Sequence, residues 1–286
     1  MTKSRLPQVA GVYCFPIKGL RGYETPKAEL LRGAGMKYDR IWALSKADQK
    51  TPDPTRSTVQ WQNKSNFAVQ FAYPELAAFQ VEFGYPPDTL DYFDGEQMRP
   101  CDLRNVQERV SFARAVDQYL KQHHQSAPPL FLSGNESAQV QFFDRKLGQV
   151  SILNQASLDD LSVKLRANLP SSVEMPNELD IKRFRGNVVL SGMPAWTELQ
   201  WVGKEITFHG SLQLATVGDA PKPPCRIRIT QKITRCSNID VDPVTGDTSV
   251  PLLQTIKEQY NHGYFGVVGE VIQTGIVSKG DRFKLI

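Results

Sequence analysis

Short runs of apolar residues, interrupted by glycine, proline and aspartate, fill most of the first hundred positions. Residues 9–20 (VAGVYCFPIKGL) and 28–49 (AELLRGAGMKYDRIWALSKADQ) have this pattern, which is typical of short strands joined by turns. Phe79, Val81 and Phe83 then recur with a period of two, as side chains on one face of a strand do. The N-terminal part of the chain is therefore predicted to be β.

Helical periodicity first occurs in residues 106–124, VQERVSFARAVDQYLKQHH. Val110, Ala113, Val116 and Leu120 are spaced by three or four positions, which one face of a helix produces and a strand does not. The Ser-Ala-Pro-Pro that follows breaks the pattern. We place a domain boundary there, which divides the chain into residues 1–125 and 126–286.

The second half begins with a predicted strand, VSILN, and a helix that Ser157 is expected to cap and Pro170 to stop. Strands then return, and only residues 252–260 (LLQTIKEQY) interrupt them with a helix. The expected strands lie within residues 184–192, 199–209, 211–218, 225–234, 265–275 and 281–286. Short strands with glycine-rich turns favour a closed or nearly closed barrel. The predicted fold class is mainly β with a few helices: an N-terminal β-barrel-like domain followed by a second β-barrel.

Net charge, the lengths of the apolar runs and the cysteine spacing indicate which kinds of partner and which compartment to expect. The 286 residues carry a formal charge of +4, which favours anionic ligands but is far below that of a dedicated nucleic-acid binder. No apolar run has the length of a signal peptide or a membrane span, so we expect no membrane partner and a cytoplasmic location. The four cysteines contain no C-x-x-C pair, which fits reduced thiols in a cytoplasm.

Cys236 is the first candidate for chemistry. A thiolate is a nucleophile and a soft metal ligand, and the neighbouring Arg235 favours the ionised form. The alternative is that a lone cysteine on a strand is a small buried apolar residue. The turn after it is not an EF-hand, because a loop starting at Asp240 would have Thr245 at its sixth position and Pro251 at its twelfth. It is predicted to be a tight connection.

Common enzyme motifs are absent from the sequence. The four histidines have no zinc spacing, and there is no G-x-S-x-G elbow, Walker loop or dinucleotide fingerprint. The basic run KPPCRIRITQKITR, residues 222–235, has alternating charges that are usual for a solvated strand face. If this run has a function, an anionic ligand is its natural partner.

Several separated stretches together resemble the MOSC family, named for the molybdenum cofactor sulfurase C-terminal domain. They are FPIKGLRG and GMKYDRIWAL (15–22 and 35–44), RFRGNVVLSG (183–192) and RCSNIDVDPVTGD (235–247). Their order is similar to the family arrangement of an N-terminal β-barrel domain followed by the MOSC barrel. Gly19, Gly186 and Asn238 depart from residues common in the family.

The resemblance implies a function and a site. It implies that Cys236 coordinates the molybdenum of a molybdopterin cofactor, and that Lys18, Arg40, Arg185 and Asn187 hold the cofactor phosphate and pterin. Thr234 and Arg235, beside the cysteine, are further expected cofactor contacts. Relatives similar to the mitochondrial amidoxime-reducing component reduce N-hydroxylated compounds, so the implied activity is that of a reductase of small N-hydroxylated substrates.

Two other function classes stay open. One is a carrier that binds the cofactor, or bears a persulfide on Cys236, without turning over a substrate. The other is an anion- or nucleic-acid-binding barrel, which rests on the basic strand alone. For the reductase, a plant-type iron-sulfur site would need the spacing C-x4-C-x2-C, which the cysteines lack. A separate flavin or iron-sulfur protein is therefore the expected electron donor, and nucleic acid is not an expected partner.

Overall fold

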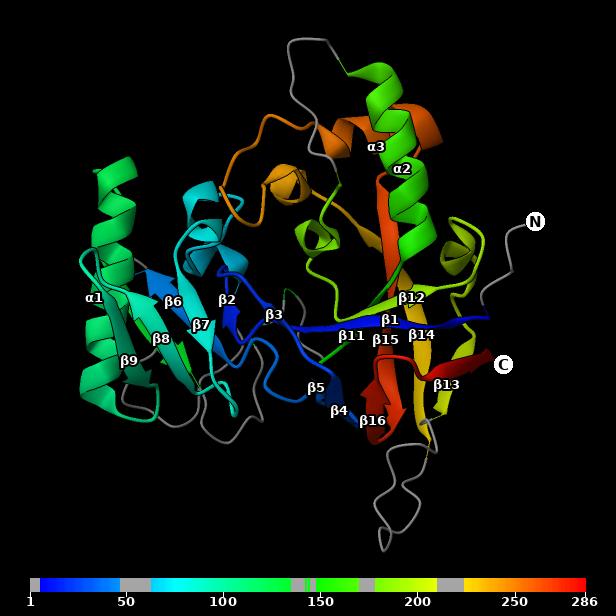
Figure 1. The fold of residues 1–286 in the computed structure, drawn as a ribbon, viewed down its shortest axis with the longest axis horizontal. Coiled ribbons are helices and arrows are strands. Elements are labelled where there is room, and N and C mark those ends of the chain that lie inside the picture. Colours follow the sequence, from blue (N-terminus) through cyan, green and yellow to red (C-terminus); the bar gives the residue numbers. More distant parts are fainter. Residues whose placement is uncertain are drawn as a thin grey trace, which may run out of the picture.

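A closed β-barrel dominates the C-terminal half of the computed structural model (Figure 1), which describes residues 6–46, 63–134, 142, 144, 148–169, 178–209 and 224–286. Seven described strands follow one another around the barrel in the order β12, β11, β15, β14, β13, β17 and β1, and β1 pairs again with β12. Their bounds are β1 Gln8–Cys14, β11 Val150–Asn154, β12 Val188–Ser191, β13 Glu205–His209, β14 Cys225–Thr234, β15 Tyr264–Gln273 and β17 Arg282–Leu285. The predicted fold class is confirmed.

Three smaller sheets accompany the barrel in the described part of the chain. They are β10-β6-β2 (Leu130–Gly134, Trp42–Lys46, Ile17–Lys18), β16-β4-β5 (Gly275–Ser278, Lys27–Leu31, Gly35–Met36) and β7-β8-β9 (Val81–Phe83, Thr89–Phe93, Met98–Asp102). A short strand, β3 (Tyr23–Glu24), pairs antiparallel with the end of β1. Strands from both halves pair across residue 125, since β1 closes the barrel and β10 pairs with β6. The proposed boundary itself stays a prediction.

The first helix, α1 (Val106–His123), confirms the predicted helical segment. Asn105 caps it, because its side-chain oxygen accepts a hydrogen bond from the Gln107 N–H at 2.9 Å. The predicted face is wrong at one position: Val110 is 50% exposed, whereas Arg109 is buried. The Arg109 guanidinium lies 5.4 Å from the Trp42 ring centre and donates to the Leu103 carbonyl, which compensates its burial.

Two further helices, α2 (Gln155–Asn168) and α3 (Leu252–Tyr260), lie side by side over one end of the barrel in Figure 1. The expected cap of α2 is wrong. Asn154 caps it by accepting from the Ala156 N–H at 3.1 Å, while the Ser157 hydroxyl lies inside the helix and donates to Glu198. Pro170 and the strand expected within residues 211–218 lie outside the described residues.

Three large apolar cores, and a small fourth one formed by Ala43, Phe67 and Phe142, hold the described elements together. One fills the barrel, with Val12, Ile206, Ile227 and Val267 fully buried, and a second lies between the barrel and helices α2 and α3. The third packs α1 against the N-terminal sheets. No helix within the described ranges is long and apolar enough to cross a membrane. The cytoplasmic location stays a prediction.

Candidate functional site

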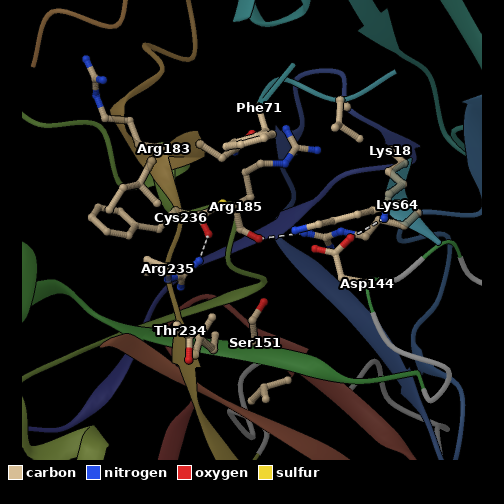
Figure 2. Close-up of a pocket in the computed structure, with 18 of the residues that line it drawn as sticks. Lys18, Lys64, Phe71, Asp144, Ser151, Arg183, Arg185, Thr234, Arg235 and Cys236 are labelled. Atoms are coloured by element: carbon tan, nitrogen blue, oxygen red, sulfur yellow. Dashed lines mark hydrogen bonds and ion pairs between the residues drawn. The ribbon is translucent and has the colours of Figure 1, made fainter. Parts of the chain in front are cut away.

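A cavity of about 260 Å³ lies where the end of β14 meets the loops around β2 and β12. All seven residues singled out in the sequence line it: Lys18, Arg40, Arg185, Asn187, Thr234, Arg235 and Cys236. In Figure 2, Cys236 and Arg235 lie on one side of this space and Lys18 on the other, with Arg185 between them. Residues more than 200 positions apart in the chain therefore share one site.

Cys236 is the only exposed thiol of the chain. It follows the end of β14 and precedes a single 3-10 turn, η6 (Ser237–Asp240), in an extended conformation that directs it out of the barrel wall. The other three cysteines are buried, and burial raises the pKa of both Cys101 and Cys225 to about 12. Only Cys236 is therefore placed to meet a ligand or metal.

Arg235 is held beside this thiol by the barrel. Its Nε donates to the Phe265 carbonyl at 2.9 Å and its Nη1 to the Phe184 carbonyl at 2.7 Å, while the guanidinium lies 5.4 Å from the Phe184 ring centre. Its buried Nη2 finds no hydrogen-bond acceptor in the described part of the chain. Burial lowers the pKa of Arg235 to about 9, so an additional anionic acceptor would stabilise its charged form.

Lys18 ends the short strand β2 and is only 6% exposed. Its Nζ donates to the Phe142 carbonyl at 2.9 Å and to Asp144 Oδ1 at 2.6 Å. Burial lowers the pKa of Lys18, and the nearby guanidinium groups of Arg40 and Arg185 lower it further, against the opposing effect of Asp144. A lysine ammonium has three donors, so one remains for an anion in the cavity.

Arg40 and Arg185 stack on the same aromatic ring. Their guanidinium carbons lie 5.1 and 4.6 Å from the centre of the Phe15 ring. Arg40 Nη2 donates to the Arg185 carbonyl at 2.9 Å, and Arg40 Nη1 pairs with the buried Asp39, which in turn accepts from the Phe15 N–H. Burial, followed by repulsion from Arg40, lowers the pKa of Arg185 to about 9.

Both of these arginines have left-handed backbones, with φ of +53° at Arg40 and +49° at Arg185. This conformation costs a non-glycine residue about 1–2 kcal/mol. Hydrogen bonds from their own N–H groups to the Phe15 and Lys182 carbonyls, at 2.8 and 3.0 Å, hold them in it. Strain of this kind is concentrated at functional sites.

Asn187 and Thr234 differ in what they offer. The Asn187 side chain is 1% exposed: its oxygen accepts from the Ser151 N–H and hydroxyl, and its nitrogen donates to the Tyr13 carbonyl and contacts the Met36 sulfur. The Asn187 amide is therefore bonded to the protein on both its oxygen and its nitrogen, and it holds the cavity wall in place. Thr234 is exposed at the end of β14, opposite Tyr264, and its hydroxyl is available to a ligand.

The turn after Cys236 braces the site, which agrees with its predicted role as a tight connection. Asp242 Oδ1 accepts from the N–H groups of Val244 and Thr245 at 2.9 Å, and its Oδ2 pairs with Arg183 at 2.6 Å. Gly246, with φ of +76°, packs so tightly that a Cβ would lie 2.9 Å from the Pro74 carbonyl oxygen. The turn therefore ties the Cys236 segment to the N-terminal half.

Two departures from the family pattern have a steric reason. At Gly19 φ is +91°, and a Cβ would lie 2.4 Å from the Ala68 carbonyl oxygen. At Gly186 a Cβ would lie 2.4 Å from the Leu153 side chain. Larger residues at these positions would require the neighbouring backbone or side chain to move.

Sequence reasoning missed several residues of the cavity: Lys64, Phe71, Asp144, Ser151 and Arg183. Phe71 is 60% exposed at the cavity and forms no aromatic contact with the described residues (Figure 2). Arg183 begins the RFRGNVVLSG stretch, so among these residues it is the one that the sequence could have indicated. Nothing in the local pattern marks Phe71 or Asp144.

The basic strand reaches the cavity only at its end, through Ile233, Thr234 and Arg235. Arg226 and Arg228 both pair with Glu205 on the neighbouring strand, as the solvated-face interpretation predicted. Within the described ranges, no three histidine, cysteine, aspartate or glutamate side chains form a group that could hold a metal ion.

Comparisons with known proteins match both halves of the chain. The profile of the MOSC N-terminal beta barrel domain matches residues 6–124, and that of the MOSC domain matches residues 139–284. Molybdenum cofactor sulfurase 1 of Aedes aegypti is 22% identical over 271 residues, which cover 89% of this chain but 32%, about a third, of that protein. Among solved structures, the YUAD protein from Bacillus subtilis has a TM-score of 0.41 at 12% identity, covering 98% of this chain and 94% of that one. YiiM from Geobacillus stearothermophilus has a TM-score of 0.28 at 14% identity, covering 48% and 53%. Because both scores are below 0.5, neither similarity bears on the function.

Proposed function

The chain belongs to the MOSC domain family, and on that premise we propose that it is a molybdenum-cofactor-dependent reductase of small N-hydroxylated compounds. One observation carries the proposal: the exposed thiol of Cys236 lines the same cavity as four cationic side chains, those of Lys18, Arg40, Arg185 and Arg235. A soft metal bound to an anionic organic group requires this combination.

The residues present fit such a cofactor. Arg235 Nη2, which has no acceptor among the described residues, and the third donor of Lys18 are both suited to an anionic oxygen. Arg40 and Arg185 add positive charge to the cavity wall, where Asp39 pairs with Arg40. These residues would hold the phosphate and pterin, and Cys236 would supply the thiolate ligand that the metal still needs.

When bound, the cofactor would supply two-electron redox chemistry at its metal. Reduction of an N-hydroxyl group to N–H and water consumes two electrons and two protons. The electrons would come from a separate flavin or iron-sulfur protein, and the protons from solvent. The role of this chain is to orient the substrate near Cys236, and Phe71, exposed at the cavity, offers a planar apolar surface for that purpose.

The second candidate function is a carrier of the cofactor or of sulfur without turnover. The exposure of Cys236 favours it, because an accessible thiol can bear a persulfide. The name of the Aedes aegypti relative, a molybdenum cofactor sulfurase, points in the same direction, although the chain spans only about a third of that protein.

One experiment separates the two functions. The protein is purified from a host that makes the cofactor, and its molybdenum content, pterin fluorescence and reduction of a hydroxylamine by reduced viologen are measured. The reductase predicts near-stoichiometric molybdenum with steady-state turnover, whereas the carrier predicts cofactor or persulfide without turnover. Clean absence of molybdenum and pterin would refute the reductase.

A further inference from the structure

A second cavity, of about 140 Å³, adjoins the one that contains Cys236. Arg183 and Arg185 line both cavities, so the two spaces meet at these side chains. The second cavity is completed by Arg21 from the loop after β2, by Gln70 and by the turn at Val241–Val244. Its volume is well below the roughly 300–1,000 Å³ of sites for drug-sized ligands, so it suits one small group.

Positive charge surrounds this second cavity. Four cationic residues line it, Arg21, Lys182, Arg183 and Arg185, and none of its described lining residues is acidic. Lys182 and Arg183 have carboxylate partners outside the cavity, Asp180 at 3.1 Å and Asp242 at 2.6 Å. Arg21 and Arg185 donate instead to the neutral carbonyls of Ala77 and Leu20, at 3.0 and 2.6 Å.

Burial makes these charges unfavourable without a counter-ion. It lowers the pKa of Arg21 and of Arg183, and with repulsion from Arg40 it lowers that of Arg185 to about 9. An anion inside the cavity would offset the cost for all of them at once.

Gln70 provides an independent observation. Its side chain lines the cavity and is only 5% exposed, yet it forms no hydrogen bond with the described residues. The amide atoms of Gln70 are not enclosed by the described part of the protein, so without a protein partner they face the cavity and can bind a ligand there. The amide N–H₂ of Gln70 can donate to an oxygen between the guanidinium groups.

We propose that this cavity binds a single phosphoryl group, held by Arg21, Gln70 and Arg185. Donors on several sides of a small space suit a compact oxyanion with several acceptor oxygens. The phosphoryl group has two possible sources: free inorganic phosphate, or a phosphate that extends from a ligand in the adjoining cavity. The proposal does not depend on the reductase activity, because phosphate binding can be measured without any cofactor.

The test is a calorimetric titration of inorganic phosphate into the full chain from a host that cannot make the cofactor. The Lys18→Ala variant removes a donor from the first cavity and should retain the binding event of the second. Arg21→Gln and Gln70→Leu should each weaken that event about tenfold or more, as expected when a charge-assisted or buried hydrogen bond is lost. Arg99→Gln, the same change at an exposed site, should bind like wild type.

The source of the group is determined with cofactor-loaded protein. If the ligand is free phosphate, loaded protein still binds it, and the binding depends on Arg21. If the group belongs to the cofactor, loaded protein no longer binds phosphate there, and the released cofactor contains more than one phosphate per pterin. Thermal unfolding shows whether each variant folds. If only one of Arg21→Gln and Gln70→Leu folds, that variant alone is enough for the test.

Two results would overturn the proposal. One is wild-type phosphate affinity in folded Arg21→Gln and Gln70→Leu proteins. The other is complete loss of phosphate binding in Lys18→Ala, which would assign all binding to the first cavity. Absence of molybdenum from the protein would leave the proposal unchanged and would count only against the reductase.

Discussion

Replacing Cys236 with serine should abolish molybdenum binding and reductase activity while leaving the fold intact. The side chain is exposed at the cavity, and the change keeps nearly the same volume. Exposed substitutions of this kind change the free energy of unfolding by no more than about 0.5 kcal/mol. A hydroxyl is a poor ligand for a soft metal, so the loss should fall on metal content and turnover.

Cys225 is the matched control, since the same atom is exchanged in a different environment. It is 0% exposed within the barrel core, and burial raises the pKa of its thiol to about 12. A serine hydroxyl there would be buried among apolar side chains, at a cost of about 1–3 kcal/mol. For a chain of this size that corresponds to a fall in Tm of roughly 2–10 °C, with molybdenum retained.

The assay measures molybdenum per chain, viologen-driven reduction of a hydroxylamine, and the Tm of each cofactor-free protein. The two variants should have opposite effects. Cys236→Ser should lose molybdenum at unchanged Tm, and Cys225→Ser should unfold at a lower Tm but keep its molybdenum. Full turnover of Cys236→Ser would show that this thiol is not the ligand. A large fall in its Tm would contradict the assignment of an exposed, structurally dispensable side chain.

Further outcomes follow from other groups. Lys18→Ala and Arg40→Ala should each weaken cofactor retention by about 1.5–3 kcal/mol, measured as pterin content after dialysis; unchanged content in both would return them to a purely structural role. Phe71→Ala should raise KM for aromatic N-hydroxylated substrates about three- to tenfold with little effect on aliphatic ones, and Phe93→Ala, which lies outside the cavity, should change neither. With NADH as sole donor the loaded protein should show no turnover, and it should turn over when reduced viologen or a flavin or iron-sulfur protein is added; efficient NADH-driven turnover would contradict the need for a separate donor. Burial raises the pKa of the Glu198 carboxyl, so its contribution to stability is fully present below its unfolded pKa of about 4.3 and is lost as the pH rises through the folded value. Urea unfolding of Glu198→Gln should accordingly vary less between pH 4 and pH 8 than that of wild type, and an identical variation would exclude this carboxyl as the source.

The sequence predicted elements well where one periodicity decided them. The apolar spacing in residues 106–124 and 252–260 corresponds to α1 and α3, and the period-two runs of the second half correspond to β13, β14 and β15. It failed where a tertiary contact prevails over the local pattern. Val110 fits the apolar stripe of α1 but is exposed, because Arg109 lies against Trp42 instead.

The candidate site shows the same division. The resemblance of their stretches to the MOSC family singled out Cys236, Arg185 and Lys18, and all three line the cavity. Asp144 and Phe71 could not be found in this way, since each reaches the cavity through its position in space and not through its neighbours in the chain. The hydrogen bond from Lys18 to the Phe142 carbonyl, for example, joins residues 124 positions apart.

The position of β1 in the barrel has a consequence for synthesis on the ribosome. Gln8 lies opposite both Ser191 and Arg282, so β1 must wait for partners that are synthesised much later. At about 5–20 residues per second, the ribosome takes roughly 10–50 s to reach the last of them. Until β12 is synthesised, β1 has only its short pairing with β3, and the edge that meets β17 stays unpaired longer, a condition that favours aggregation and chaperone binding. Closure of the barrel is therefore a late event with high contact order, and the chain should be most vulnerable to aggregation just before it.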